Sequence, residues 1–321
     1  MAVASKAIQP RLALCRRRGL VWMVSATLLL LSLLGLALSW LNPVIKLPLR
    51  LGLDFTGGTQ IQLERACSDI CNALSPYQVE HHLVEISLST NSYIALPSLE
   101  GARVQLLDSS QSIVLRLPTL TPGQGQAVIA GLEQIAGPFL PDGQAIDTIG
   151  PTLGAQLLRS SLISLSVAFT AIAIYISIRF DKFFAALALV ALGHDVIIVC
   201  GVFAWLGLSH ILEVDSLFIV ALLTIAGYSV NDTVVVFDQI RERRCVDAGL
   251  PLKTQIDNAV SVTLTRTLYT SGTTLLPLLA LILFGGAILF WFAVALALGI
   301  IIGSWSSIAL APSLLSLREG L

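Results

Sequence analysis

Charged residues are scarce in this sequence: Asp, Glu, Lys and Arg together make up 12% of its 321 residues. An ordinary soluble domain contains about 25% of them, so the composition excludes that class. Apolar residues supply 55% of the chain and the mean hydropathy is +0.84. These values predict an integral membrane protein. The formal net charge of -1 gives no indication of nucleic-acid binding, and no nucleic-acid partner is expected.

Motifs of enzyme sites are also missing from the sequence. It has no Gly-rich phosphate loop that ends in Lys, no cluster of metal ligands and no pairing of a nucleophile with a base. The stretch FTGGT at 55–59 is too short to serve as a phosphate loop. We therefore expect no enzymatic activity, no cofactor and no metal ion.

The five cysteines do not form a disulfide framework. Cys67 and Cys71, in CSDIC, could pair if they lie on the oxidising side of a membrane. Two small residues in a loop or at a helix start are the plainer interpretation. A metal site has little support, because no His or further Cys lies nearby.

Six apolar segments are each long enough to cross the hydrocarbon core of a bilayer, which takes about 20 helical residues. They lie near residues 20–41, 157–178, 183–206, 216–237, 263–284 and 287–311. The run at 20–41 is too long for a secretory signal, and no small-residue cleavage site ends it, so we interpret it as a retained span. The predicted fold class is an α-helical polytopic membrane protein with six transmembrane helices.

The positions of Lys and Arg predict how these spans are oriented. Basic residues precede the first span and lie between spans two and three and between spans four and five, whereas the loops 207–215 and 285–286 contain none. Because basic loops remain in the cytoplasm, the termini 1–19 and 312–321 are expected to be cytoplasmic. Residues 42–156, between the first span and the five spans within 157–311, then form an extracytoplasmic (periplasmic) domain.

Residues 42–156 have the pattern of a small α+β domain. Period-two alternation predicts strands at 59–64 and 112–118, and a further strand lies near 144–151. Helices are predicted at 75–87, where Ser75 is placed to cap and Pro76 follows in the first turn, and at 123–137. Strand, helix, two strands, helix, strand is the order of a ferredoxin-like sandwich. The stretch 88–103 receives no assignment.

Ionisable residues inside the spans are the candidate functional residues, because a charge at the centre of a membrane helix costs about 2.5–3.5 kcal/mol. Span four carries Asp232 between Asn231 and Thr233, and span five carries Arg266. The helical rise of about 1.5 Å per residue gives Asp232 and Arg266 comparable depths on antiparallel helices, so they could meet. One interpretation is a structural ion pair. Many nearby hydroxyl and amide side chains favour the other, a hydrated proton path.

Span three contains a second pair of intramembrane polar residues, His194 and Asp195. Neighbouring helical residues project about 100° apart, so the two cannot both face one path. A structural role is the preferred interpretation, and a direct part in proton movement stays the alternative.

Four motifs carry a resemblance that covers nearly the whole chain from Arg11 onward. They are GLDFTGGTQIQLE (52–64), IGPTLGAQL (149–157), GYSVNDTVVVFDQIRER (227–243) and TLTRTLYTSGTTLL (263–276). In this order and on this topology they resemble the SecD/SecF family of the Sec protein-export machinery, on its SecF side.

The resemblance implies a function, partners and site residues. It implies half of a twelve-helix core of the resistance-nodulation-division type, completed by SecD as a separate chain or a fusion. It implies work with the SecYEG translocon on unfolded preproteins in the bacterial plasma (inner) membrane, driven by protons in the late steps of translocation. The implied proton relay is Asp232 and Arg266 with Asn231 and Thr233. The implied substrate-contacting motif consists of Asp54, Phe55, Thr56, Gly57 and Gly58.

Two other classes of function stay open from the residues alone. The chain could be half of a proton-driven exporter of small molecules or lipids. It could also be a non-conducting scaffold of a translocon, in which Asp232 has a purely structural role.

Overall fold

The computed structural model describes residues 14–43, 45–67, 73–88, 95–100, 102–107, 110–209 and 212–317. The chain divides into two units. The helical unit comprises residues 1–50 and 161–321, and the α/β unit comprises residues 51–160. The long helix α5 begins in the α/β unit and ends in the helical unit.

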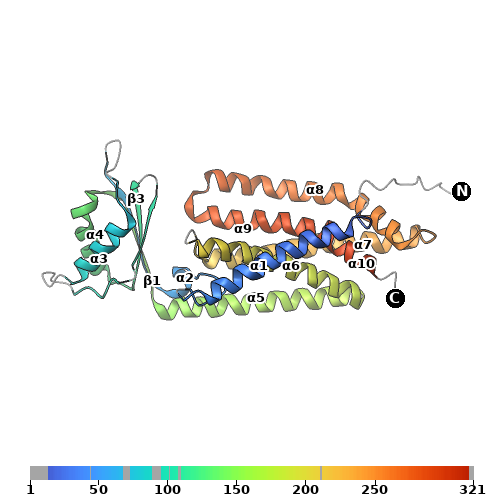
Figure 1. Ribbon diagram of the computed structural model, residues 1–321, viewed down its shortest axis with the longest axis horizontal. Coiled ribbons are helices and arrows are strands. Elements are labelled where there is room, and N and C mark those ends of the chain that lie inside the picture. The colour runs from blue at the N-terminus through green and yellow to red at the C-terminus, as the bar shows by residue number, and fades with distance from the viewer. Residues whose placement is uncertain are drawn as a thin grey trace. The chain divides into compact units, whose positions relative to one another are not determined.

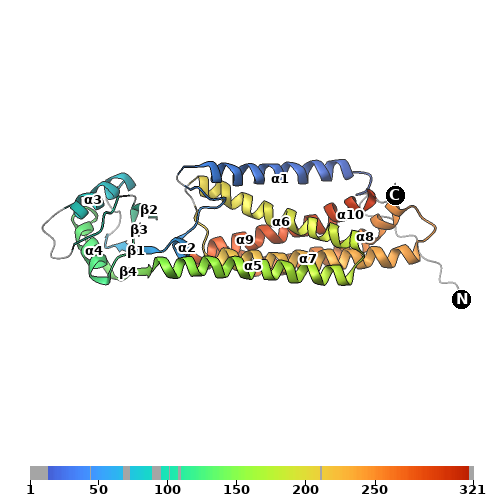
Figure 2. The same cartoon turned by 90° about the horizontal axis from the view of Figure 1, so that it is seen from below.

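The helical unit consists of long apolar helices that lie lengthwise along one another (Figures 1 and 2). Their bounds are α1 Arg18–Leu41, α5 Pro151–Arg179, α6 Lys182–Leu208, α7 Ser216–Val246, α8 Leu252–Phe284, α9 Gly286–Trp305 and α10 Ala311–Leu315. Six stretches among the described residues are long and apolar enough to cross a membrane, the last running from α9 into α10. The predicted class is confirmed, and the chain is a multi-pass membrane protein.

Helices α7 and α8 extend beyond the apolar spans predicted at 216–237 and 263–284. Helix α7 continues through the basic residues before Val246, and α8 begins at Leu252. Apolar composition marks only the part of a helix that suits lipid, so it does not reveal polar turns that continue beyond the membrane.

The centre of the helical unit is formed by α6, α7 and the last span. Half of the most apolar stretch of α6 and of α7 is buried, and 61% of the last span, against 11% for α8 and 6% for α5. Small residues allow the close packing that membrane helices need in place of a hydrophobic driving force. At Gly303, for example, an added Cβ would lie 3.2 Å from Ser229 Cβ of α7.

A π-helical turn, Ser306–Leu310, interrupts the last span between α9 and α10. All five of its residues are buried. Such turns displace the following side chains around the helix axis and occur often at functional sites. Here the turn brings the consecutive residues Ser306 and Ser307 toward α6 and α7.

The α/β unit has the predicted order of elements, preceded by a short helix. The bounds are α2 Leu53–Thr56, β1 Gly58–Arg65, α3 Pro76–Leu88, β2 Arg103–Leu107, β3 Ser112–Leu117, α4 Pro122–Ala136 and β4 Phe139–Ile149. The antiparallel sheet has the order β2-β3-β1-β4, with Ile61 opposite Leu115 on one side and Ile146 on the other. Helices α3 and α4 cover the same face of the sheet (Figure 1). The ferredoxin-like prediction is confirmed.

Local sequence signals explain where both covering helices begin. Ser75 accepts a hydrogen bond from the Gln78 backbone N–H (3.2 Å), and the Gln78 side chain accepts one from the Ser75 N–H (3.0 Å). Thr121 and Gln124 form the same reciprocal pair before α4. Each pair satisfies two backbone donors that the first helical turn leaves without partners. The Ser75 cap is therefore as predicted.

Cys67 lies just after β1 and is disulfide-bonded. Its predicted partner, Cys71, lies outside the described residues, as do 89–94 and 101 of the unassigned stretch. Cys200 and Cys245 have free thiols, and Cys15 is buried.

Candidate functional site

The Asn-Asp-Thr triplet of α7 separates into outward and inward side chains, because successive helical residues project about 100° apart. Asn231 is exposed, whereas Asp232 and Thr233 are 4% and 1% exposed. Thr233 Oγ1 lies 2.8 Å from Ser307 Oγ of the π-helical turn. Asp232 Oδ2 is buried and has no hydrogen-bond partner among the residues that the structure describes. Asp232 is thus a buried carboxyl group with one oxygen free to take a proton.

Arg266 lies on α8 and is exposed in this isolated chain. Its positive charge acts on Asp232, but within the described residues no ion pair of 4.0 Å or less joins them. Helix α8 packs on its neighbours through a stripe that includes Thr263, Thr267 and Ser271. Arg266 projects to one side of this stripe. The direct contact with Asp232, which the similar depths of the two residues allowed, is therefore not formed.

Two exposed faces of α8 differ in chemistry. One face carries Arg266 with Tyr269, Thr270 and Thr273. The other carries exposed leucines at Leu268, Leu279 and Leu283. A leucine face suits lipid, whereas a guanidinium in the hydrocarbon core is costly unless protein or water meets it. The face around Arg266, which we call the polar face of α8, therefore requires a covering that lipid does not supply.

Hydroxyl groups connect the polar face of α8 to the interior of the helical unit. Tyr228 of α7 donates to Ser271 Oγ (3.2 Å), and Ser271 Oγ lies 2.6 Å from Ser304 Oγ of α9. Thr274 donates to the Tyr228 hydroxyl (3.4 Å). The last span contributes several of these serines, which the sequence interpretation passed over. Their signal is the run SWSS at 304–307 inside an otherwise apolar span.

His194 and Asp195 of α6 are both buried, and they contact each other. His194 Nδ1 lies 2.9 Å from Asp195 Oδ1. Asp195 Oδ2 accepts hydrogen bonds from Ser229 Oγ of α7 (2.6 Å) and from Ser306 Oγ of the π-helical turn (2.7 Å). One carboxylate thus joins the three central elements of the unit. The expectation that the two side chains diverge did not foresee this contact between neighbouring residues.

In the α/β unit, the segment from Asp54 to Gly58 has a packing role. Phe55 is buried, and Thr56 is exposed with its hydroxyl bonded to Gly52 O (3.1 Å). Gly57 and Gly58 have φ of 71° and 132°, values that side chains rarely adopt. A Cβ on Gly57 would lie 2.8 Å from Pro151 Cα, and one on Gly58 would lie 2.7 Å from Leu117 O. The two glycines therefore let β1 start against the N-terminus of α5 and against β3.

We expect Gly57→Ala to lower the free energy of unfolding of the α/β unit by at least about 2 kcal/mol, from backbone strain and overlap with Pro151. Gly137→Ala is the matched control, because Gly137 also has a positive φ, 82°, but its added Cβ would meet nothing within 4 Å. It should cost about 1 kcal/mol. Limited proteolysis of the full chain in denaturant measures both. Equal losses of unfolding free energy in the two variants would contradict the packing role of Gly57.

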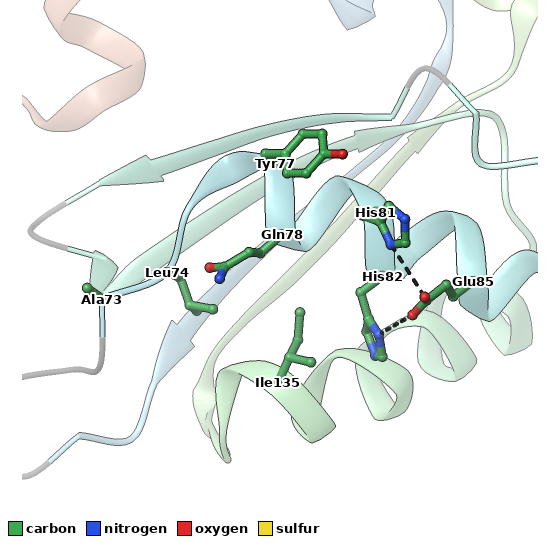
Figure 3. A pocket seen from close by; sticks show the side chains of 8 residues that line it. All are labelled: Ala73, Leu74, Tyr77, Gln78, His81, His82, Glu85 and Ile135. Atoms are coloured by element: carbon green, nitrogen blue, oxygen red, sulfur yellow. Dashed lines mark hydrogen bonds and ion pairs between the residues drawn. The ribbon is translucent and has the colours of Figure 1, made fainter.

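The α/β unit also has an open pocket of about 570 Å³ along α3 (Figure 3). Tyr77, Leu74 and Ile135 supply its apolar wall, and Tyr77 is 73% exposed. His81 Nδ1 and His82 Nδ1 each lie 3.4 Å from the carboxylate of Glu85 (Figure 3). Within the described residues, no group of three or more His, Cys, Asp and Glu has an arrangement that could hold a metal ion. The lining of the pocket thus combines apolar and polar side chains.

Comparisons with known proteins assign the family. The profile described as "Protein export membrane protein SecD/SecF, C-terminal" matches residues 140–319, and that of the "SecD/SecF GG Motif" matches residues 44–68. The chain belongs to the SecD/SecF family. It is 56% identical to the protein translocase subunit SecF of Prochlorococcus marinus, over 95% of this chain and 94% of that one. The SecF of Synechocystis is 41% identical, over 91% and 90%.

Solved SecDF structures share the fold. The crystal structure of SecDF, a translocon-associated membrane protein from Thermus thermophilus, matches 95% of this chain with a TM-score of 0.77 and 30% identity. SecDF in its super-membrane-facing form matches with a TM-score of 0.61 and 29% identity. This SecD/SecF chain spans 38% of the length of each SecDF chain.

Proposed function

We propose that this chain is the SecF-type subunit of a Sec protein-export machinery in the bacterial plasma membrane. It acts with a SecD-type partner and the SecYEG translocon, and it uses proton flow to promote late steps in the translocation of unfolded preproteins. The observation that carries the proposal is Asp232, a buried carboxyl group with one unpartnered oxygen beside the polar face of α8. Membership of the SecD/SecF family supports the process.

The proton chemistry follows from the surroundings of Asp232. A buried carboxylate without a paired cation is costly, and protonation removes that cost. Arg266 acts on Asp232 from α8 without forming an ion pair. A proton on Asp232 therefore removes the attraction of the carboxylate for Arg266 and weakens the electrostatic attraction between α7 and α8. This change supplies two arrangements of the helices that a proton gradient can drive in turn.

The SecD-type partner completes the membrane core in this proposal. The polar face of α8 needs a covering of protein or water, and a carboxylate from a partner helix would pair with Arg266 and offset its cost. The SecDF chains supply a precedent, because this chain matches only 38% of their length. We assign the contact surface for the partner to Arg266, Thr270 and Thr273, together with the exposed Asn231 of α7.

The α/β unit is the proposed contact for preproteins, on the far side of the membrane. The distribution of Lys and Arg supports that location and cytoplasmic termini. Helix α5 runs without interruption from Pro151, which touches the Gly57 region, into the helical unit. Movement of the membrane helices would therefore be transmitted to the α/β unit through α5.

Co-purification tests the assignment to export. We expect the tagged chain, extracted in mild detergent, to bring down a SecD-type protein and SecY. A control tag on an unrelated multi-pass protein of the same membrane should bring down neither. Recovery of neither protein with the tagged chain would reject the proposal and favour an exporter of small molecules or lipids.

Site-specific cross-linking tests where a preprotein makes contact. We expect a photo-reactive residue at Tyr77, in the open pocket, to cross-link a stalled export substrate. A photo-reactive residue at Thr56 tests the predicted motif Asp54–Gly58, which mostly packs against the rest of the unit. It should cross-link the export substrate several-fold less than the residue at Tyr77. An opposite ranking would return the contact to Asp54–Gly58. No cross-link at either position, nor at other exposed sites of the unit, would remove the preprotein contact.

A further inference from the structure

We propose that Asp195 is a second proton-accepting carboxyl group, and that the π-helical turn connects its charge state to the segment of α7 that carries Asp232. The proposal rests on the proton-coupled function proposed for Asp232. It concerns a separate side chain on a separate helix. The contacts of Asp195 with α6, α7 and the π-helical turn carry the inference.

No cation among the described residues pairs with Asp195, which is 0% exposed. Its carboxylate oxygens contact His194 Nδ1 and the hydroxyls of Ser229 and Ser306. Among the elements packed on α6, helix α7 supplies Tyr228 and Asp232 at this depth. The other elements are α1, α9, the π-helical turn and α10, and their only ionisable side chain is Arg18, at the start of α1. The charge of Asp195 thus depends on hydrogen bonds or on a proton.

The two ring nitrogens of His194 differ in their contacts. Its Nε2 is buried and has no hydrogen-bond partner in the described part of the chain. A buried N–H without an acceptor is rarer and more costly than a buried acceptor without a donor. We therefore assign the single ring proton to Nδ1, which donates to Asp195 Oδ1 at 2.9 Å. His194 then contributes a hydrogen bond and no positive charge.

The hydroxyl of Ser306 has a hydrogen-bond partner for either charge state of Asp195. When Asp195 is ionised, Ser229 and Ser306 both donate to its Oδ2. Ser306 Oγ also lies 3.1 Å from Gly303 O, a second acceptor for its hydrogen. When a proton binds Oδ2, Ser306 turns its hydrogen to Gly303 O and accepts the new O–H of Asp195. One proton is gained, one hydrogen bond reverses, and no other proton leaves.

The reversal occurs where the π-helical turn holds α7. Ser306 is the first residue of that turn, and the next, Ser307, bonds Thr233 Oγ1 (2.8 Å) and donates to Ser229 O (3.4 Å). These two contacts bind α7 at Ser229 and Thr233, which lie before and after Asp232 in the helix. Gly303 lies beside the same groups, since a Cβ there would lie 3.2 Å from Ser229 Cβ and 3.6 Å from Asp195 Oδ2. A change at Ser306 therefore acts directly on the part of the last span that positions Asp232.

Infrared difference spectroscopy tests the proposal on the full chain assembled with its SecD-type partner in lipid vesicles. Lowering the pH also protonates exposed Asp and Glu side chains, so the carbonyl-stretch band of each site is identified from the difference between the spectra of the original chain and of each variant. We expect Asp232→Asn to remove one band and Asp195→Asn to remove the other. Ser306→Ala should displace the second band alone, because the protonated Asp195 loses its acceptor. Ser313→Ala is the matched control: Ser313 is a buried serine of α10 that bonds Leu310 O, and its loss should move neither band.

The outcomes separate this proposal from the proposed function. If Asp195→Asn removes no band, Asp195 keeps one charge state and the present proposal fails, whatever happens at Asp232. If Asp232→Asn removes no band but Asp195→Asn does, the role of Asp232 fails and the second site stands. Should Asp195→Asn not assemble, Ser306→Ala decides: a displaced band supports the proposal, and an unchanged spectrum overturns it.

Discussion

Replacing Asp232 with Asn is expected to abolish the stimulation of protein export by a proton gradient, while the chain still inserts and assembles. Asn nearly preserves the volume and the hydrogen-bonding capacity of the side chain but cannot titrate. One proton crossing 100 mV supplies about 2.3 kcal/mol, enough to shift a conformational equilibrium roughly forty-fold. Losing that bias should reduce gradient-stimulated export to the level without a gradient.

The measurement is export into membrane vesicles with and without an imposed gradient, alongside the yield of the complex. Asp238→Asn is a matched control on the same helix, because Asp238 is 40% exposed and pairs with Arg179 at 2.6 Å. It should retain the stimulation, since an exposed ion pair contributes little. Equal loss in both variants would indicate general damage to α7.

The double variant Asp232→Asn with Arg266→Gln separates a relay from a structural contact. If the two residues only stabilise packing, removing both charges relieves the uncompensated arginine and restores function as well as assembly. A relay keeps its assembly in both variants and does not recover stimulation in the double variant. Normal stimulation in either the single or the double variant would remove Asp232 from the mechanism and favour the scaffold.

Replacing Arg266 with Leu is expected to have opposite effects in the free chain and in the complex. Without a partner, the exposed guanidinium costs about 2.5–3.5 kcal/mol in the membrane, so the variant chain should resist unfolding in lipid better than the original. With the SecD-type partner, loss of the cation should weaken assembly by about 2 kcal/mol or more, roughly thirty-fold in affinity.

Quantitative pull-down with a titrated partner and unfolding in lipid vesicles measure the two effects. Leu268→Ala serves as the control, because Leu268 is 57% exposed on the leucine face of the same helix. It should leave assembly unchanged. Unchanged affinity with Arg266→Leu would show that the polar face of α8 is not the contact with the partner.

The sequence predicts the class of fold and misses features that depend on geometry. Runs of apolar residues locate six spans because each must match the thickness of the bilayer. Strand β2, Arg103–Leu107, was expected in the order of elements but was not located, because a five-residue strand at the sheet edge gives too short an alternation. The π-helical turn also leaves no periodic signal, since it consists of a single turn within an apolar helix.

The candidate site was predicted by residue type but not by arrangement. A charge in an apolar span is visible in the sequence, and so Asp232, Arg266, His194 and Asp195 were all named as candidates. Helical rise gave Asp232 and Arg266 a common depth but not the direction in which each projects. The serines that hold Asp195 come from two other elements. Their convergence depends on tertiary packing that spacing along the chain does not contain.

Proton entry into sealed vesicles tests the central claim most directly. The vesicles hold this chain with its SecD-type partner and the translocon, and a pH-sensitive dye reports the lumen while a preprotein is exported. We predict that proton entry accompanies export with the original chain and falls to the background rate with Asp232→Asn. Identical proton entry in the two preparations would contradict a proton-coupled role for this chain.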